Sequence, residues 1–334
     1  MRDKQKKWYV DKPENNQNLL REGKHLKVTA GNSDTPKKLL VARLCGGLGN
    51  QMFIYAAARR LALKNDAELA LDIVNGFTND SYERFFQLDL FNLKARIATP
   101  NETMRPFHRI RRKLAIFGNK NLPFNERDFV KQNGVEIEKA LLEMCLGQYT
   151  YLEGYWQGEV YFRDCADIIR DDFQLVSKPS SPNLTMFNEI TIRENPVALH
   201  VRFFDPPDTE KSDNATITYY QNAMTALEEK IANPYYYIFS DLPYQASKML
   251  NLKNDCFTLV THNDTPETSP FDMWLMSRCR HFVIANSTFS WWGAWLGQSE
   301  DKIVFAPKLT KDVFGKYASW GFEGLLPVEW QQIE

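Results

Sequence analysis

Short apolar runs alternate with helical segments along the second half of the chain, and this alternation limits the fold more than any other feature. The runs at 196–202, 235–239, 257–260, 282–285 and 302–305 are predicted strands. Strands that alternate with helices predict a parallel, doubly wound α/β sheet. Ligands of such sheets bind at the carboxyl ends of the strands. Polar residues at these ends are therefore candidates for a binding site.

The strand ends of this half carry residues that suit a phosphate-bearing ligand. They are His200 and Arg202 on the first strand, Asp241 on the second, and Asn286, Ser287 and Thr288 on the fourth. Arg202 offers a planar fork of donors that matches a pyrophosphate. Ser287 and Thr288 open a helix, where hydroxyls, free backbone N–H groups and the helix dipole favour an anion. The alternatives are an ordinary helix cap for these two residues and a satisfied core histidine for His200.

The first half opens with a strand, a glycine-rich turn and a helix, as Rossmann-like units do. A strand at 39–44 runs into Gly46-Gly-Leu-Gly-Asn-Gln51, and an alanine-rich helix follows. The third glycine of a dinucleotide fingerprint would fall at Met52, and no Gly-Lys-Ser/Thr sequence follows. The turn is therefore either a structural βα turn or a place where a ligand approaches the backbone, with Asn50 and Gln51 as donors.

An aromatic-rich segment at 148–158 is a second candidate surface. Its rings can stack on a sugar, and its polar residues can hydrogen-bond to one. The residues concerned are Tyr151, Tyr155 and Trp156 for stacking, with Glu153 and Gln157 as hydrogen-bonding partners. Aromatic residues at this density also suit a core. The tryptophans after Thr288 are instead predicted to be packing that holds the helix start rigid: Trp291, Trp292 and Trp295.

A strongly basic run, Arg105–Lys113, is the remaining candidate in the first half. It is interpreted either as a solvated helix face or as a surface for anionic lipid head groups or a charged glycan. Peripheral contact with the inner face of the cytoplasmic membrane through this run is the most that the sequence suggests.

Length, charge and cysteine content limit the class of protein. We predict a flexible polar extension at 1–38, an N-terminal domain at 39–180 and a C-terminal domain at 195–334, divided at a proline-rich segment. A formal net charge of −1 gives no support for binding nucleic acid. The five cysteines are scattered without C-x-x-C spacing, which argues against a disulfide framework or a zinc site. No apolar run approaches the ~20 residues that span a bilayer, so we expect a cytoplasmic protein.

Six blocks of sequence, taken together, point to a family. They are Gly46-Gly-Leu-Gly-Asn-Gln51, Tyr151-Leu-Glu-Gly-Tyr-Trp-Gln157, His200-Val-Arg202 with Asp205, Phe239-Ser-Asp241, Phe271-Asp-Met-Trp-Leu-Met-Ser-Arg-Cys279 and Asn286-Ser-Thr-Phe-Ser-Trp-Trp-Gly-Ala-Trp295. In this order they resemble the signature blocks of the bacterial α-1,2-fucosyltransferases, glycosyltransferase family 11. The resemblance extends from about residue 39 to the C-terminus.

This resemblance implies a GT-B fold, in which two Rossmann-like domains face each other across a cleft. It implies GDP-β-L-fucose as the donor, inversion at the anomeric carbon, and no metal or cofactor. No Asp-x-Asp motif occurs, so arginine and a helix end would neutralise the pyrophosphate. His200 and Asp272 would meet guanine, Arg202 the β-phosphate, and Ser287 with Thr288 the pyrophosphate. The donor-binding residues implied are Gly47, Gly49, His200, Arg202, Asp241, Asp272, Asn286, Ser287 and Thr288.

The predicted acceptor is O2 of a terminal galactose in an oligosaccharide or a lipid-linked precursor of a surface glycan. Its binding residues would be Glu153, Tyr155, Trp156 and Gln157, and the catalytic residues Arg202, Asn50 and Asp205. An inverting displacement calls for a base near the acceptor hydroxyl. The candidates, left unranked, are Asp205, Asp208, Asp72 and Glu153.

One position departs from the family pattern, because Phe203 stands where a second arginine is usual. The first arginine, Arg202, is intact. Three alternatives stay open: another linkage or sugar donor, a GDP-sugar-binding protein without turnover, and a dinucleotide-dependent oxidoreductase. The incomplete glycine fingerprint disfavours the last of these.

Overall fold

The computed structural model describes residues 37–78, 80–206, 212–253, 255–308 and 320–334. All but the last two residues of the predicted polar extension lie outside these ranges, as does Asp208. Among the described residues, none of the helices combines the length and the apolar character needed to cross a bilayer.

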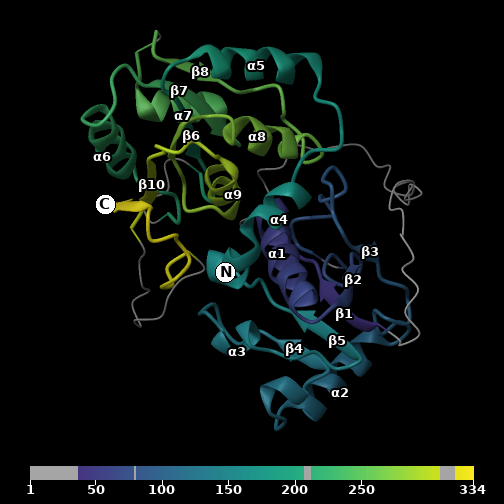
Figure 1. Cartoon of the computed structure of the whole chain (residues 1–334). Coiled ribbons are helices and arrows are strands. Elements are labelled where there is room, and N and C mark those ends of the chain that lie inside the picture. The colour runs from purple at the N-terminus through teal and green to yellow at the C-terminus, as the bar shows by residue number, and fades with distance from the viewer. Residues whose placement is uncertain (1–36, 79, 207–211, 254, 309–319) are drawn as a thin grey trace. The chain divides into compact units, whose positions relative to one another are not determined.

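The first half of the described chain forms a parallel sheet with β1 at its centre (Figure 1). In spatial order the strands are β3 (Arg96–Ile97), β2 (Ala67–Asp72), β1 (Lys38–Arg43), β5 (Tyr149–Glu153) and β4 (Phe129–Lys131). Interior strands of a parallel sheet are covered on both faces, which explains the continuous apolar sequence of β1. The glycine turn and α1 (Leu48–Lys64) connect β1 to its neighbour β2.

The second half forms another parallel sheet, as the alternation of strands and helices predicts. Its spatial order is β11 (Gln331–Ile333), β10 (Val304–Pro307), β9 (His281–Val283), β6 (Pro196–Val201), β7 (Tyr235–Ser240) and β8 (Phe257–Leu259). Two parallel α/β sheets confirm the predicted fold class. The cleft between two domains and the domain limits stay predictions.

The other helices connect these strands or flank them. They are α2 (His108–Asn119), α3 (Lys139–Leu142), α4 (Ala166–Asp172), α5 (Ser181–Ile192), α6 (Ile217–Glu228), α7 (Pro243–Leu250), α8 (Ser269–Met276) and α9 (Thr288–Leu296), with 3-10 turns at Phe124–Glu126, Glu159–Tyr161 and Arg163–Cys165. The segment predicted to divide the domains contains α5. Its Pro182 falls in the first turn, where proline is tolerated, rather than breaking the helix. Phe187 of α5 stacks on Trp274 of α8 with ring centroids 5.3 Å apart.

Helices α1 and α9 pack against each other through a cluster of buried aromatic side chains. Phe53 of α1 lies with its ring centroid 4.5 Å from that of Trp291 and 4.9 Å from that of Trp292. Trp295 is likewise buried and stacks on Trp291. The predicted packing role of the three tryptophans is thus confirmed, and it extends across to the first sheet.

Candidate active site

The register of the second sheet brings its predicted site residues to one edge. Val201 pairs with Ser240, so Arg202 and Asp241 follow directly on neighbouring strands. A guanidinium nitrogen of Arg202 lies 3.2 Å from Asp241 Oδ2, and both side chains are partly exposed. The backbone N–H of Phe203 donates to the other carboxylate oxygen at 3.1 Å. Asp241 therefore orients Arg202 at the end of β6 while leaving part of its donor fork in solvent.

His200 is held neutral beneath this pair. Its side chain is buried, and its ring centroid lies 5.6 Å from that of Phe289 in α9. Burial, helped by the positive charge of Arg202, lowers the pKa of His200 to about 3. Its Nδ1 atom has no hydrogen-bond partner among the described residues. Because buried polar atoms are usually satisfied, this nitrogen is an open position for a ligand or a water.

The start of α9 combines an ordinary cap with an open helix end. Ser287 is the N-cap residue, and its Oγ accepts from Phe289 N at 3.3 Å. The capping alternative is therefore correct for Ser287. No acidic side chain occupies the first turn of the helix. The positive end of its dipole is thus not neutralised from within the helix.

Gly49 lets the starts of α1 and α9 touch. A Cβ atom at this position would lie 2.5 Å from the backbone carbon of Thr288 and 2.7 Å from its Oγ1. Trp292 Nε1 donates to the Gly49 carbonyl at 2.9 Å and fixes the same contact from the α9 side. Helix α1 also has no acidic residue in its first turn. Two uncompensated helix starts therefore meet here, which favours an anion at this place.

The glycine turn gathers three of the predicted residues on the first-sheet side. Asn50 Oδ1 accepts from Gln157 Nε2 at 2.9 Å. Gly46 has φ +76°, and a Cβ there would lie 2.8 Å from Asn50 Nδ2 and 3.3 Å from a ring carbon of Tyr155. Tyr155 is 41% exposed. Asn50, Gln157 and Tyr155 thus line the same turn, next to the start of α1.

Gln51, the other predicted donor of this turn, is used inside the protein. Its amide nitrogen donates to the carbonyl oxygens of Gly46 and Phe85, and its amide oxygen accepts from Gln87 N. The side chain is fully buried. Because these hydrogen bonds use both ends of its amide, Gln51 holds the turn in place and is not free to bind a ligand.

The predicted stacking role is wrong for two of the three aromatic residues. Trp156 is fully buried and packs edge-on against Tyr161, with ring centroids 5.9 Å apart. Tyr151 is also buried and donates to Asp72 Oδ2 at 2.6 Å. Both belong to the segment around β5, an interior strand between β1 and β4 that is covered on both faces. Tyr155 alone keeps an exposed ring.

Two of the predicted bases are engaged in internal contacts. Glu153 accepts from two nitrogens of Arg112, with Nε at 2.6 Å, and lies 3.8 Å from Arg43. Burial would raise the pKa of Glu153, but the hydrogen bonds from Arg112 and the charge of Arg43 hold it below its usual value. Asp72 is buried and accepts from Tyr151 and from Asn75. Neither carboxylate is free to take a proton from an acceptor.

The other predicted base, Asp205, organises the loop after β6. Its Oδ2 accepts from Asp213 N at 2.9 Å and from Ser212 Oγ at 3.3 Å. Asn286 reaches the same loop, since its Nδ2 donates to the Asp213 carbonyl at 2.7 Å. The Oδ1 atom of Asn286 is buried without a partner in the described structure. Asn286 and Asp205 therefore both hydrogen-bond to the backbone of Asp213.

Asp272 lies in the first turn of α8 and is set in an amide network. Asn263 Nδ2 donates to it at 2.7 Å, and Asn263 in turn bonds to Asn183. Burial raises the pKa of Asp272 to about 7, although the hydrogen bond from Asn263 opposes this shift. The carboxyl group therefore titrates near neutrality, which is typical of functional positions.

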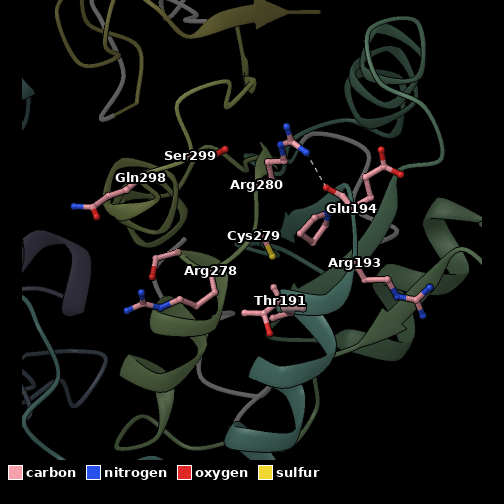
Figure 2. Close-up of a pocket in the computed structure, with 11 residues that line it drawn as sticks. Thr191, Arg193, Glu194, Arg278, Cys279, Arg280, Gln298 and Ser299 are labelled. Atoms are coloured by element: carbon pink, nitrogen blue, oxygen red, sulfur yellow. Dashed lines mark hydrogen bonds between the residues drawn. The ribbon is translucent and has the colours of Figure 1, made fainter.

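A hollow of about 320 Å³ lies at the opposite edge of the second sheet (Figure 2). Arg193, Glu194 and Arg280 line it, and Arg280 donates to the Glu194 carbonyl at 3.0 Å. Pro196 at the start of β6 also contributes, so this hollow faces the amino ends of the strands. It is remote from the strand ends that carry Arg202 and Asp241. Within the described ranges, no three His, Cys, Asp or Glu residues gather closely enough to hold a metal ion.

Comparisons with known proteins identify a family for this chain. The family model described as Glycosyl transferase family 11 matches residues 40–333. The chain is 29% identical over 286 residues to an α-1,2-colitosyltransferase of Escherichia coli, covering 80% of this chain and 91% of that protein. It is 32% identical over 295 residues to the O-antigen biosynthesis glycosyltransferase WbnK of Escherichia coli, covering 79% and 92%.

Solved structures of fucosyltransferases also match at low sequence identity. The fucosyltransferase NodZ from Bradyrhizobium is 15% identical with a TM-score of 0.48, and the match covers 78% of this chain and 93% of that one. A variant of Arabidopsis thaliana FUT1 in complex with GDP is 13% identical with a TM-score of 0.49, covering 84% and 72%.

Proposed function

Because the chain belongs to glycosyl transferase family 11, we propose that it transfers L-fucose from GDP-β-L-fucose to O2 of a terminal β-galactose. The acceptor would be a precursor of a surface glycan, as the name of the O-antigen relative suggests. The observation that carries the proposal is the contact of Gly49 with Thr288. It joins the glycine turn, on the acceptor side, to the helix start that would receive the pyrophosphate.

In the proposed reaction, the acceptor O2 attacks the anomeric carbon of fucose while the bond from that carbon to the β-phosphate oxygen breaks. The bonding pair leaves with GDP, and the configuration inverts from β to α. Arg202 and the start of α9 would stabilise the growing negative charge on the phosphate, as preorganised donors do. His200 in its neutral form and the carboxylate of Asp272 would bind the guanine. Asp241 would keep Arg202 in place.

On the acceptor side, Tyr155 would stack on the galactose ring, with Asn50 and Gln157 binding its hydroxyls. The acceptor proton has one remaining candidate base among the described residues, Asp205, whose Oδ1 is not used by the loop contacts described above. Positioning by Asn50 is the alternative, since a dissociative transition state depends less on a base. A colitosyl donor is a second candidate, favoured by the name of one relative.

Product analysis tests the reaction directly. Incubation with GDP-fucose and lactose should give one trisaccharide, whose NMR spectrum shows an α-fucosyl residue on galactose O2. The rate should not change when EDTA is added. A product of another linkage, or turnover only with GDP-colitose, would redirect the assignment within the family. Tight GDP binding without turnover on any galactoside would instead identify a binding protein.

A pH-dependent affinity for GDP is expected from Asp272. Ionised Asp272 can accept from both guanine N1–H and N2–H₂, so the affinity should rise between pH 6 and pH 8. The stability of the free protein should fall as the pH rises from about 4 to about 7 and should level off above that. The folded pKa of about 7 lies above the unfolded value, so the stabilisation is lost as pH rises through it. Calorimetric titration with GDP and thermal unfolding measure the two effects.

Asp272→Asn is the control, because it keeps the size of the side chain and the contact with Asn263 while removing the charge. It should flatten the pH dependence of the stability of the free protein. In the affinity for GDP it should leave only the slope caused by titration of the nucleotide phosphates. His262 is the other titratable group in this network, and burial lowers its pKa from the usual value of a histidine. If the affinity for GDP changed with pH equally in the wild type and in Asp272→Asn, Asp272 would not contact the guanine.

A further inference from the structure

Helix α2 presents an apolar stripe to solvent. Its members are Phe107, Ile110, Leu114 and Phe117, which are 74%, 60%, 65% and 80% exposed. At 100° per residue, the three helical positions, Ile110, Leu114 and Phe117, fall within an arc of about 60° on one face, and Phe107 is the N-cap residue that precedes the helix. The opposite face of α2 packs against the first sheet, where Ala115 and Ile116 contact the buried cluster around Phe129. The stripe therefore has no part in holding the helix to the protein.

Exposed cations flank this stripe. Arg109, Arg111 and Lys113 are all exposed, and the sequence of α2 contains no acidic residue. Of the basic residues in the helix, Arg112 points inward to Glu153. The ion pairs found within the described part of the chain do not include the three exposed cations. Arg111 lies on one side of the stripe and Lys113 on the other.

We propose that α2 is a docking helix for a bilayer that contains anionic lipid. An interfacial helix buries an apolar face at the level of the head groups while cations on its borders meet lipid phosphates. Both features occur here on the same exposed face. A merely solvated helix would explain the cations but not four large apolar side chains turned to water. A glycan would explain the cations equally well, but an aliphatic and phenyl stripe offers it few hydrogen bonds.

The same helix start borders a hollow of about 520 Å³. Phe107 and His108 line it together with Asn75, Thr78 and Arg105. Asn75 follows the carboxyl end of β2, so the hollow lies on the edge of the first sheet where ligands of α/β proteins bind. Docking through α2 would bring this edge to the lipid surface, where a lipid-linked acceptor is held.

Sedimentation with vesicles tests the proposal on the full chain, without any glycosyl transfer. The protein should bind vesicles that contain phosphatidylglycerol and not vesicles of phosphatidylcholine alone. Leu114→Glu with Phe117→Glu should lower the affinity roughly tenfold or more, because both insert in the interface. Replacing Arg109, Arg111 and Lys113 by glutamine should weaken binding by a similar factor and remove most of its salt dependence.

Ile192→Glu is the matched control, since Ile192 is 81% exposed on α5, away from α2. It should bind vesicles as the wild type does, and thermal unfolding should show that all these surface variants are folded. Wild-type affinity in the Leu114→Glu, Phe117→Glu variant, or no binding of the wild type to anionic vesicles at low salt, would overturn the proposal. A concentration-dependent dimer that this variant abolishes, without vesicle binding, would assign the stripe to a second copy of the chain.

Discussion

Arg202→Ala should lower the rate of glycosyl transfer by about a hundredfold to a thousandfold, the usual effect of removing one donor to a developing charge. The guanidinium is held at the end of β6 by Asp241 and keeps part of its fork free. Stability should change little, because partly exposed ion pairs contribute at most about 1 kcal/mol. Steady-state kinetics with GDP-fucose and lactose, read together with thermal unfolding, separates the two effects.

Two variants serve as controls for this result. Arg202→Lys keeps the charge but loses the planar fork, so its rate should fall between those of the wild type and Arg202→Ala. Arg193→Ala removes an exposed arginine at the amino edge of the same sheet, where it stacks on Tyr235. Its rate should be unchanged. Near wild-type transfer by Arg202→Ala would show that the phosphate is bound elsewhere.

Gly49→Ala should damage both the fold and the activity. The new Cβ would lie 2.5 Å from a backbone atom of Thr288, which cannot move without shifting α9. Overpacking of this kind costs about 1–3 kcal/mol. The displaced helix start would also move Ser287 and Thr288 away from the proposed pyrophosphate. Chemical unfolding and transfer assays should therefore both show a loss.

Gly47→Ala is the control two residues away. Gly47 has φ −74° and open space around it, since a Cβ there meets no atom within 4 Å. This variant should be as stable as the wild type. Any loss of activity in it would then report on a ligand that approaches the turn. If Gly49→Ala were as stable as the wild type, the contact between α1 and α9 would not have the role assigned to it.

The alternation of strands and helices predicted five of the six strands of the second sheet, because each of these five is a distinct apolar run. It missed β11, whose sequence Gln-Gln-Ile is polar and largely exposed. The strands of the first sheet that follow β2 were harder to predict from the sequence. Strand β3 has two residues and β4 has three, too few to show a period. The stacking role predicted for Tyr151 and Trp156, in the segment around β5, was wrong for a related reason. Whether Trp156 is exposed depends on the strands that flank β5, and the local sequence does not contain that information.

The part of the candidate site that lies at the ends of strands could be predicted from the sequence. Arg202, Asp241 and the start of α9 follow buried strands, and parallel register then places them at one edge. The contact between Gly49 and Thr288 was not predictable, since it joins segments from the two halves of the chain. A glycine within a helical run signals only that something approaches closely. What approaches is decided by the packing of tryptophan rings on Phe53.

The packing between α1 and α9 also limits which chimeras of related proteins can fold. The aromatic cluster belongs to both sheets, and the indole of Trp292 is hydrogen-bonded to the backbone of Gly49. A chimera that takes its first sheet from one parent and its second from another must preserve both Gly49 and the tryptophans that pack against α1. A larger residue at 49 would clash, and a smaller ring at 292 would leave a void. Under the proposed function, donor and acceptor preferences would therefore not be freely recombinable, because one shared core constrains the sequences of both sheets.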